Sequence, residues 1–337
     1  MLNFDPARFL RIQTGTVTIA RDLGALVGRL VAEGADSLFF MGSGGAGILM
    51  QPAADLMRRG SKLPCHNVLC AEIVLTGHVA LGPKSVVVMP SLSGTTKESI
   101  AAMDYVKARG ATVISITGHA DTPLAKGADH AFVNFAEDDT SCEMFYVTSL
   151  VAALAVMQAR GERSDYDRII GELAGLPQQL LAVKQAFEPR ADALARAIAA
   201  DGWHIITGSG AAWPQAYYYG MCILEEMQWI RTRPVHASDF FHGTLELVEK
   251  GVSVVVFAGE DETRPLTDRV IAFAKGYTDK LTVLDTRDLA TTGLSSDLRA
   301  MLAPALLATV LERLSAHLEV MRNHPLVTRR YYKRVAY

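Results

Sequence analysis

The sequence predicts an α/β fold in which two tandem domains, each built on a doubly wound parallel sheet, are related by internal duplication. Residues 37–47 are matched by residues 203–213, and each copy is a short apolar run that ends at Gly-Ser-Gly. Residues 85–91 and 251–257 form a second matched pair at the same offset. Because helix-forming segments follow these runs, the pattern predicts buried parallel strands that alternate with helices. Such alternation is typical of a parallel sheet with helices on both faces.

The first half can be assigned element by element. Apolar residues recur at helical spacing from about residue 7 to residue 33, so this segment is predicted to be an amphipathic helix. Strands are expected near 37–41, 66–69, 85–90, 112–117 and 130–134, and helices over 47–59, 95–109 and 143–160. The charged stretch 161–177 contains Gly and Pro, so we expect it to be a linker.

The second half repeats this scheme and ends in a basic, aromatic tail. Strands are expected near 204–207, 235–240, 253–257 and 280–285, and a long Leu- and Ala-rich helix over about 304–321. The end of the chain contains a rigid Pro325 and many aromatic residues, so we expect it to be docked, with a solvated tail as the alternative. The predicted divisions are residues 1–165, residues 166–325 and a tail over 326–337 that is docked near the active site.

Composition excludes several classes of function. The chain has 337 residues, half of them hydrophobic, which is enough for two domains with cores of their own. The net charge is −3 with both signs well mixed, so there is no basic field for nucleic acid. The apolar runs are short and interrupted, so no membrane span or signal peptide is expected. The four cysteines lack metal-ligand spacing, which predicts a reduced, cytoplasmic protein without a metal site.

A hydroxyl-rich loop follows the third predicted strand. Ser91-Leu92-Ser93-Gly94-Thr95-Thr96 places hydroxyl groups and a glycine in front of a predicted helix, at the edge where open α/β sheets bind ligands. Small side chains would let an anion reach backbone amides, in the field of the helix dipole. Any one of these residues taken alone is more often a helix cap. The loop lacks the lysine of a nucleotide P-loop, which favours a phosphate monoester. Acidic residues replace the loop in the second half, so only the first half is expected to hold a phosphate.

Five motifs together carry a resemblance to a known family. They are Gly42-Ser43-Gly44, the Ser-x-Ser-Gly-x-Thr loop at 91–96, Gly208-Ser209-Gly210, Leu-Glu-Glu-Met-Gln-Trp at 224–229 and Phe-Phe-His-Gly-Thr-Leu-Glu at 240–246. From about residue 20 to its end, the chain resembles the sugar isomerase (SIS) family with two tandem, flavodoxin-like SIS domains. The stretch 233–246 is most similar to deglycases of phosphorylated Amadori products such as fructoselysine 6-phosphate. The Glu and His-Gly pair is shared with the isomerase half of glucosamine-6-phosphate synthase.

The resemblance implies roles for individual residues. A proton that moves between C1 and C2 of a phosphosugar needs a base and an acid. The resemblance assigns Glu226 as the base and His242 as the ring-opening or acid/base group, whereas Glu225 remains a solvated helix residue. The phosphate and sugar would be held by Ser43, Gly44, Ser91, Ser93 and Thr96. Further candidates are Gly42, Gly94, Thr95, Ser141, His236, which is structural or orients substrate, and Arg330.

The resemblance also implies an activity. We expect a homodimeric, cofactor-free deglycase that converts a 6-phosphofructosamine, through an enaminol, to glucose 6-phosphate and a free amine. The relatives place a C-terminal lysine near the sugar, but the tail here offers Arg329, Arg330 and Lys333 with no matching lysine. A preceding glutaminase domain is also absent from the sequence, which argues against an ammonia-fed synthase. The alternatives are a glucosamine-6-phosphate deaminase, an aldose/ketose isomerase and a non-catalytic phosphosugar sensor.

Overall fold

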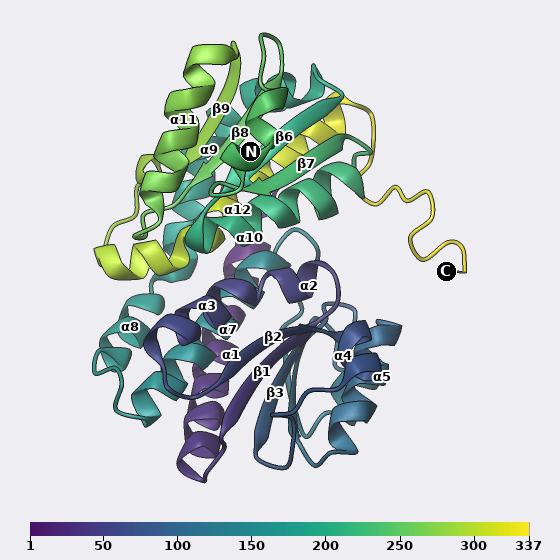
Figure 1. The fold of residues 1–337 in the computed structure, drawn as a ribbon, viewed down its shortest axis with the longest axis vertical. Helices are drawn as coiled ribbons and strands as arrows, with labels where there is room; N and C mark the ends of the chain where they lie inside the picture. The colour runs from purple at the N-terminus through teal and green to yellow at the C-terminus, as the bar shows by residue number, and fades with distance from the viewer. Residues whose placement is uncertain (337) are drawn as a thin grey trace. The chain divides into compact units, whose positions relative to one another are not determined.

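The structure, a computed structural model, describes residues 1–336 and divides into two compact units. The N-terminal unit comprises residues 6–178. The C-terminal unit comprises residues 1–5 together with the chain from residue 179 onward. The two units are described separately, and Figure 1 labels the elements of both.

The N-terminal unit is a five-stranded parallel sheet in the order β2-β1-β3-β4-β5. Its strands are β1 (Ser37–Gly42), β2 (Cys65–Leu69), β3 (Ser85–Pro90), β4 (Thr112–Thr117) and β5 (His130–Val133). Its helices are α1 (Pro6–Ala32), α2 (Gly45–Ile48), α3 (Gln51–Gly60), α4 (Cys70–Thr76), α5 (Lys97–Lys107), α6 (Pro123–Gly127), α7 (Ser141–Ala159) and α8 (Tyr166–Leu173). Helices α1 and α3 pack against α7, and α4 and α6 pack against α5. These two groups of helices cover opposite faces of the sheet (Figure 1).

The C-terminal unit repeats this arrangement with one strand fewer. Its parallel sheet has the order β7-β6-β8-β9, formed by β6 (Trp203–Gly208), β7 (Arg231–His236), β8 (Ser253–Ala258) and β9 (Lys280–Asp285). Its helices are α9 (Leu176–Ala199), α10 (Trp213–Tyr218), α11 (Arg264–Tyr277) and α12 (Ser296–Met321). The short turns are η1 (Gly210–Ala212), η2 (Tyr219–Glu225), η3 (Phe240–His242), η4 (Thr244–Leu247) and η5 (Thr286–Asp288). The prediction of two tandem parallel-sheet domains is therefore confirmed.

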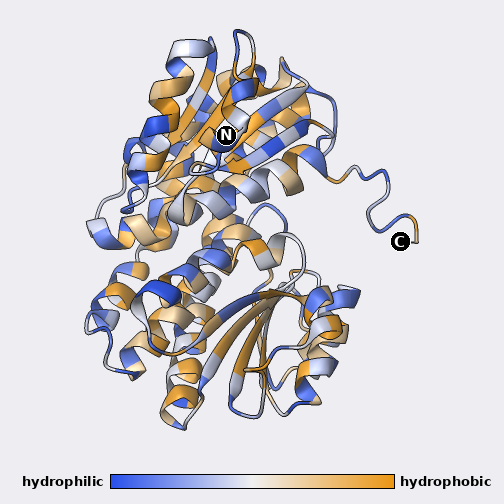
Figure 2. Cartoon of the chain, in the orientation of Figure 1, coloured by the Kyte–Doolittle hydropathy of each residue, from blue (hydrophilic) through white to orange (hydrophobic). Residues whose placement is uncertain are grey.

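The central strands form where the sequence is apolar and β-branched. Every residue of β1, β3 and β8 is buried, as expected for parallel strands covered on both faces. Hydrophobic residues accordingly concentrate on the strands and on the inward helix faces (Figure 2). Two helices, α7 and α12, are long and apolar enough to cross a membrane, but 89% and 83% of their apolar windows are buried inside the fold. Both are therefore core helices of their units.

Two of the secondary-structure predictions were wrong. The segment expected to be a linker contains α8, because Ile169 and Leu173 on one face of this helix are buried. The strand expected at 235–240 begins earlier, at Arg231, and pairs with β6 as far as His236. Strand β7 lies at the sheet edge, where the missing amide of Pro234 costs least, so proline is tolerated within it.

Buried charges attach the first residues of the chain to the C-terminal unit. Arg313 of α12 is fully buried and contacts Glu188 of α9 at 2.7 Å. The same guanidinium donates to the carbonyl of Leu2, and the Leu2 amide donates to Glu188 Oε1 at 2.7 Å. Bonds to Arg313, Leu2 and His317 outweigh the effect of burial and lower the pKa of Glu188 to about 2. Since a buried cation without a partner is strongly unfavourable, these bonds hold Leu2 against α9 and α12.

Candidate active site

The hydroxyl-rich loop begins directly after β3. Ser91 is buried, and its Oγ accepts a hydrogen bond from the Gly94 amide at 3.2 Å and lies 3.3 Å from Thr96 Oγ1. Thr95 Oγ1 donates to Ser93 Oγ at 3.1 Å. Gly94 has φ +61, and a Cβ there would collide with Thr122, so glycine is needed. The loop is thus a compact turn that carries its hydroxyls at the start of α5.

The Gly-Ser-Gly turn after β1 lies next to this loop. Ser43 Oγ is 3.4 Å from Ser99 Oγ, which belongs to the first turns of α5. Gly42 and Gly47 approach so closely that a side chain on Gly42 would strike the Gly47 backbone. Gly44 has φ +55 and precedes α2. Strands β1 and β3 are neighbours whose connections leave in opposite directions, which makes this a topological switch point, where open sheets bind ligands.

A buried thiol lies beneath these hydroxyls. Cys70 Sγ contacts Ser99 Oγ at 3.8 Å. Burial raises the pKa of the Cys70 thiol, so this side chain is neutral. The predicted candidate Ser141 lies elsewhere in the unit, buried at the start of α7, where its Oγ contacts the Asp138 carbonyl at 3.5 Å.

In the C-terminal unit, a carboxylate of the chain occupies the corresponding turn. Asp261 Oδ2 accepts a hydrogen bond from the Ala211 amide at 2.8 Å, and Oδ1 accepts one from the Thr263 amide at 2.9 Å. A Cβ on Gly210, which has φ +52, would collide with this carboxylate. The Gly208-Ser209-Gly210 turn is therefore already occupied by a carboxylate of the same chain. This arrangement gives a physical reason for expecting phosphate in the first half only.

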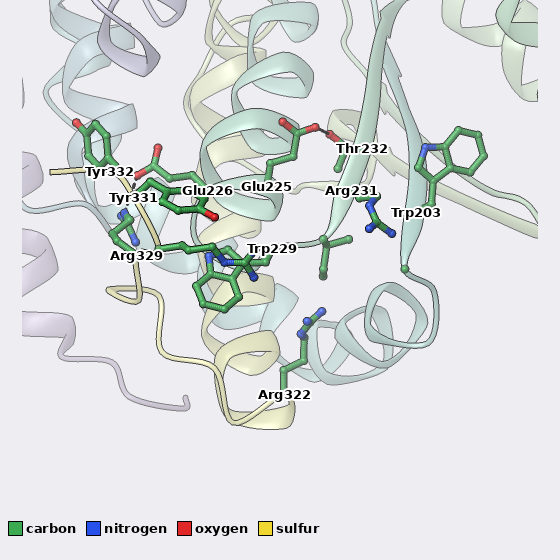
Figure 3. Close-up of a pocket in the computed structure, with 13 residues that line it drawn as sticks. Trp203, Glu225, Glu226, Trp229, Arg231, Thr232, Arg322, Arg329, Tyr331 and Tyr332 are labelled. Atoms are coloured by element: carbon green, nitrogen blue, oxygen red, sulfur yellow. Dashed lines mark hydrogen bonds and ion pairs between the residues drawn. The ribbon is translucent and has the colours of Figure 1, made fainter. Parts of the chain in front are cut away.

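Glu226 lines a cavity of about 920 Å³ in the C-terminal unit. The walls come from the end of η2, from β7 and from the tail (Figure 3). They include Glu225, Trp229, Arg231, Thr232, Arg322, Arg329, Arg330, Tyr331 and Tyr332. The volume lies at the upper end of the range for small-molecule sites. The predicted base therefore faces a space that can admit a sugar derivative.

The two adjacent glutamates have different partners. Glu226 Oε1 pairs with Arg329 Nε at 2.8 Å, and the Glu226 side chain is 29% exposed. Glu225 Oε1 instead accepts a hydrogen bond from Thr232 Oγ1 at 2.5 Å, which directs it toward β7 (Figure 3). The two glutamates, to which the sequence analysis assigns different roles, thus have different surroundings in the structure.

A change from α-helical to π-helical winding determines the position of Glu226. The helix begins as α10 and continues as η2 with π-helical bonds, in which the Glu226 amide donates to Met221 five residues back at 3.1 Å. The helix ends at Trp229, whose φ of +55 is unusual for a bulky residue. Such π-helical segments occur frequently at functional sites because they redirect side chains. The sequence indicates a helix here but gives no sign of this change in winding.

The structure does not bring His242 to the cavity that Glu226 lines. His242 ends η3, its side chain is exposed, and its amide donates to the Asp239 carbonyl at 2.9 Å. His236 lies at the end of β7, where Nδ1 is 2.7 Å from Ser238 Oγ and the ring packs edge-on against Trp213. Neither histidine lines the cavity.

Tail residues contribute more to this cavity than the sequence indicated. The Arg330 guanidinium lies over the Trp229 ring, 4.2 Å from its centroid. Arg329 was not among the predicted site residues, although it pairs with Glu226. The available signal was the pair of arginines after Pro325. Among residues 1–336, no cluster of three or more His, Cys, Asp or Glu side chains is suited to a metal ion.

Comparison with known proteins agrees with this arrangement. A model of the SIS domain matches residues 33–160. Fructosamine deglycase FrlB of Bacillus subtilis is 32% identical over 96% of this chain and 99% of its own length. The chain belongs to the SIS family. A second SIS relative, fructoselysine 6-phosphate deglycase of Escherichia coli K12, is 28% identical over 91% of this chain and 88% of its own.

Solved structures support the same assignment along the whole length of this SIS protein. A crystal structure described as a phosphosugar isomerase of Bacillus subtilis superposes with a TM-score of 0.88 at 31% identity. It covers 96% of this chain and 99% of its own. The similarity therefore includes both units, although the SIS model itself matches the first.

Proposed function

We propose that this SIS protein is a deglycase that cleaves a 6-phosphorylated fructosamine to glucose 6-phosphate and a free amine. The observation that carries the proposal is the similarity, over almost the entire length, to relatives named as deglycases of fructosamines and fructoselysine 6-phosphate. The glutamate at the 920 Å³ cavity and the hydroxyl-rich loop at the β1/β3 switch point provide chemistry that suits such a substrate.

Glu226 is the proposed base. In the open-chain ketosamine, C1 carries the amine and C2 is the carbonyl carbon. Removal of a C1 proton by the carboxylate gives an enaminol, and return of a proton to C2 leaves an imine at C1. Addition of water to the imine then releases the amine and the aldehyde of glucose 6-phosphate. A positioned base is needed because general acid–base catalysis contributes about a hundredfold to ten-thousandfold to such transfers.

Hydroxyls and amides of the N-terminal unit are the proposed phosphate ligands. Ser43, Ser91, Ser93 and Thr96, with the Gly44 amide, offer neutral donors at the beginning of α2 and α5. A helix N-terminus adds a favourable field for the dianion. Gly42, Gly94 and Thr95 shape the same turns. The second half is not proposed as a phosphate site because Asp261 fills its turn.

His242 is proposed as the group that shuttles protons at the sugar oxygens. Since it does not line the cavity of its own chain, we propose that a partner subunit supplies it, which would make the active enzyme a cytoplasmic homodimer. His236 and Arg330 are proposed to orient the substrate. No cofactor is required, because the ketosamine carries its own amine and the carbanion is stabilised by the neighbouring carbonyl.

Product analysis tests the proposal against its alternatives. The purified protein would be incubated with fructoselysine 6-phosphate, glucosamine 6-phosphate and fructose 6-phosphate, with separate assays for free lysine, ammonia and hexose phosphate. Release of lysine with an equal amount of glucose 6-phosphate supports the deglycase. Ammonia from glucosamine 6-phosphate would indicate a deaminase, and ketose–aldose interconversion alone an isomerase. Tight binding without any turnover would indicate a sensor.

A further inference from the structure

The C-terminal tail is docked on the residues that follow Glu226. Gln228 Nε2 donates to the His324 carbonyl at 2.7 Å, and the His324 ring packs edge-on against Trp229, with centroids 4.6 Å apart. Arg330 covers the same indole, 4.2 Å from its centroid. The segment 324–330 thus contacts the residues that follow η2 through a hydrogen bond and two ring contacts.

Within this docked segment, the guanidinium of Arg329 is fixed by the tail itself. Its Nη1 donates to the carbonyl of Leu326 at 2.6 Å and to that of Thr328 at 3.0 Å. Its Nε faces Glu226 Oε1 at 2.8 Å, and the Arg329 side chain is only 14% exposed. Since the planar guanidinium presents its donors in a rigid fork, fixing Nη1 also fixes the direction of Nε. The cation therefore meets the carboxylate in one orientation (Figure 3).

The surroundings of Glu226 contain more cationic than acidic groups. The cations are Arg231 from β7, Arg322 directly after α12 and Arg330 from the tail, which also contributes Tyr331 and Tyr332. The neighbouring acid, Glu225, is bonded to Thr232. Arg329, from the tail, forms an ion pair with Glu226 at 2.8 Å. An opposite charge at such a distance favours the ionised carboxylate. A carboxylate that is to accept a proton from carbon must first be ionised.

We propose that Arg329 is the positioning residue for Glu226, holding the carboxylate ionised and oriented toward the cavity, and that the docked tail exists to present it. This inference rests on the proposed role of Glu226 as the base. It assigns a function to a residue that touches the base and need not touch the reacting carbon.

The test compares Arg329→Gln, which removes the charge, with Arg329→Lys, which keeps it. Arg334→Gln serves as the matched control because it removes an exposed arginine from the same tail. In Arg329→Gln, the acid limb of the pH–rate profile on fructoselysine 6-phosphate should move to higher pH by about 1 unit or more, with KM changed little. Arg329→Lys should reverse much of this shift. Arg334→Gln should keep the wild-type profile. A pH–rate profile of Arg329→Gln that parallels the wild type would overturn the proposal.

A second readout does not depend on turnover. In protein labelled with ¹³C at glutamate Cδ, the Glu226 signal is assigned by its loss in Glu226→Gln, and its titration is followed in each variant. The midpoint should rise in Arg329→Gln and lie in between for Arg329→Lys. An unchanged midpoint overturns the proposal even if the protein is an active deglycase. Turnover retained by Glu226→Gln would instead contradict the proposed function, and with it the catalytic role of Arg329.

Discussion

At the level of single residues, the adjacent Glu225 and Glu226 allow the proposed catalytic base to be tested, because only the loss of Glu226 should reduce turnover. Glu226→Gln keeps the shape and hydrogen-bonding capacity of the side chain but removes the base, so turnover should fall by about a hundredfold or more while phosphosugar binding survives. Glu225→Gln should be nearly silent, because its carboxylate is bonded to Thr232. Steady-state kinetics with a binding measurement checks both. More than about a tenth of wild-type turnover in Glu226→Gln would exclude this residue as the base.

Ser93 tests the phosphate loop at the same scale. Ser93→Ala removes a neutral donor to a charged ligand, which should weaken binding by about 1–3 kcal/mol. Ser209→Ala is the matched control, since Ser209 occupies the equivalent turn of the C-terminal unit, where Asp261 provides the anion. Calorimetric titration with glucose 6-phosphate measures both variants. Equal affinities for Ser93→Ala and wild type, together with unchanged affinities for Ser91→Ala and Thr96→Ala, would refute the phosphate site.

At the level of elements, Asp261 should stabilise the turn between β6 and α10. Its carboxylate accepts hydrogen bonds from two backbone N–H groups, one at each oxygen. Asp261→Asn replaces one of these oxygens by an NH₂ group, which cannot accept a hydrogen bond. We expect a loss of about 1–3 kcal/mol in the free energy of unfolding. Urea denaturation followed by circular dichroism measures this loss. Glu249→Gln, at an exposed position of the same unit, is the control, and equal stabilities of the two variants would contradict the assignment.

The elements that the sequence predicted well are those with a strong local pattern. Strands β1, β3 and β8 are continuous apolar runs that end at or directly before a glycine or proline, so their location and burial follow from composition. Helices α4 and α6 are too short to show a helical period. The π-helical turn η2 and the positive φ of Trp229 depend on tertiary packing, which local patterns do not encode. The contact between Arg329 and Glu226 joins segments far apart in the chain, and only a folded structure reveals it.

At the level of the whole molecule, Glu188 should make stability depend on acid pH. Its pKa is lowered to about 2, below the usual value of 4.5, so the ionised form stabilises the folded protein above about pH 4.5. This stabilisation should be lost as the pH falls from about 4.5 toward 2. Glu188→Gln should be destabilised at pH 7 and show a shallower loss of stability with acid. Thermal unfolding between pH 2 and pH 7 checks this, and parallel curves for both proteins would contradict it.

Assembly is the second property of the whole molecule that can be measured. If a partner subunit supplies His242, the active form must contain at least two chains. Light scattering at micromolar concentration should give twice the 36.5 kDa of one chain or more. A mixture of inactive Glu226→Gln and inactive His242→Ala chains should regain activity, because mixed dimers would contain one intact pair. Full activity in a monomer would exclude shared sites.

The carboxylate of Asp261 has a consequence for how many ligands one polypeptide can hold. The two halves contain turns with the same Gly-Ser-Gly sequence, but at the second an aspartate of the chain bonds to the backbone amides. Binding should therefore saturate at a stoichiometry of one phosphosugar per polypeptide, despite the internal repeat. The proposed phosphate site thus belongs to the first copy, because a carboxylate of the chain occupies the amides of the second.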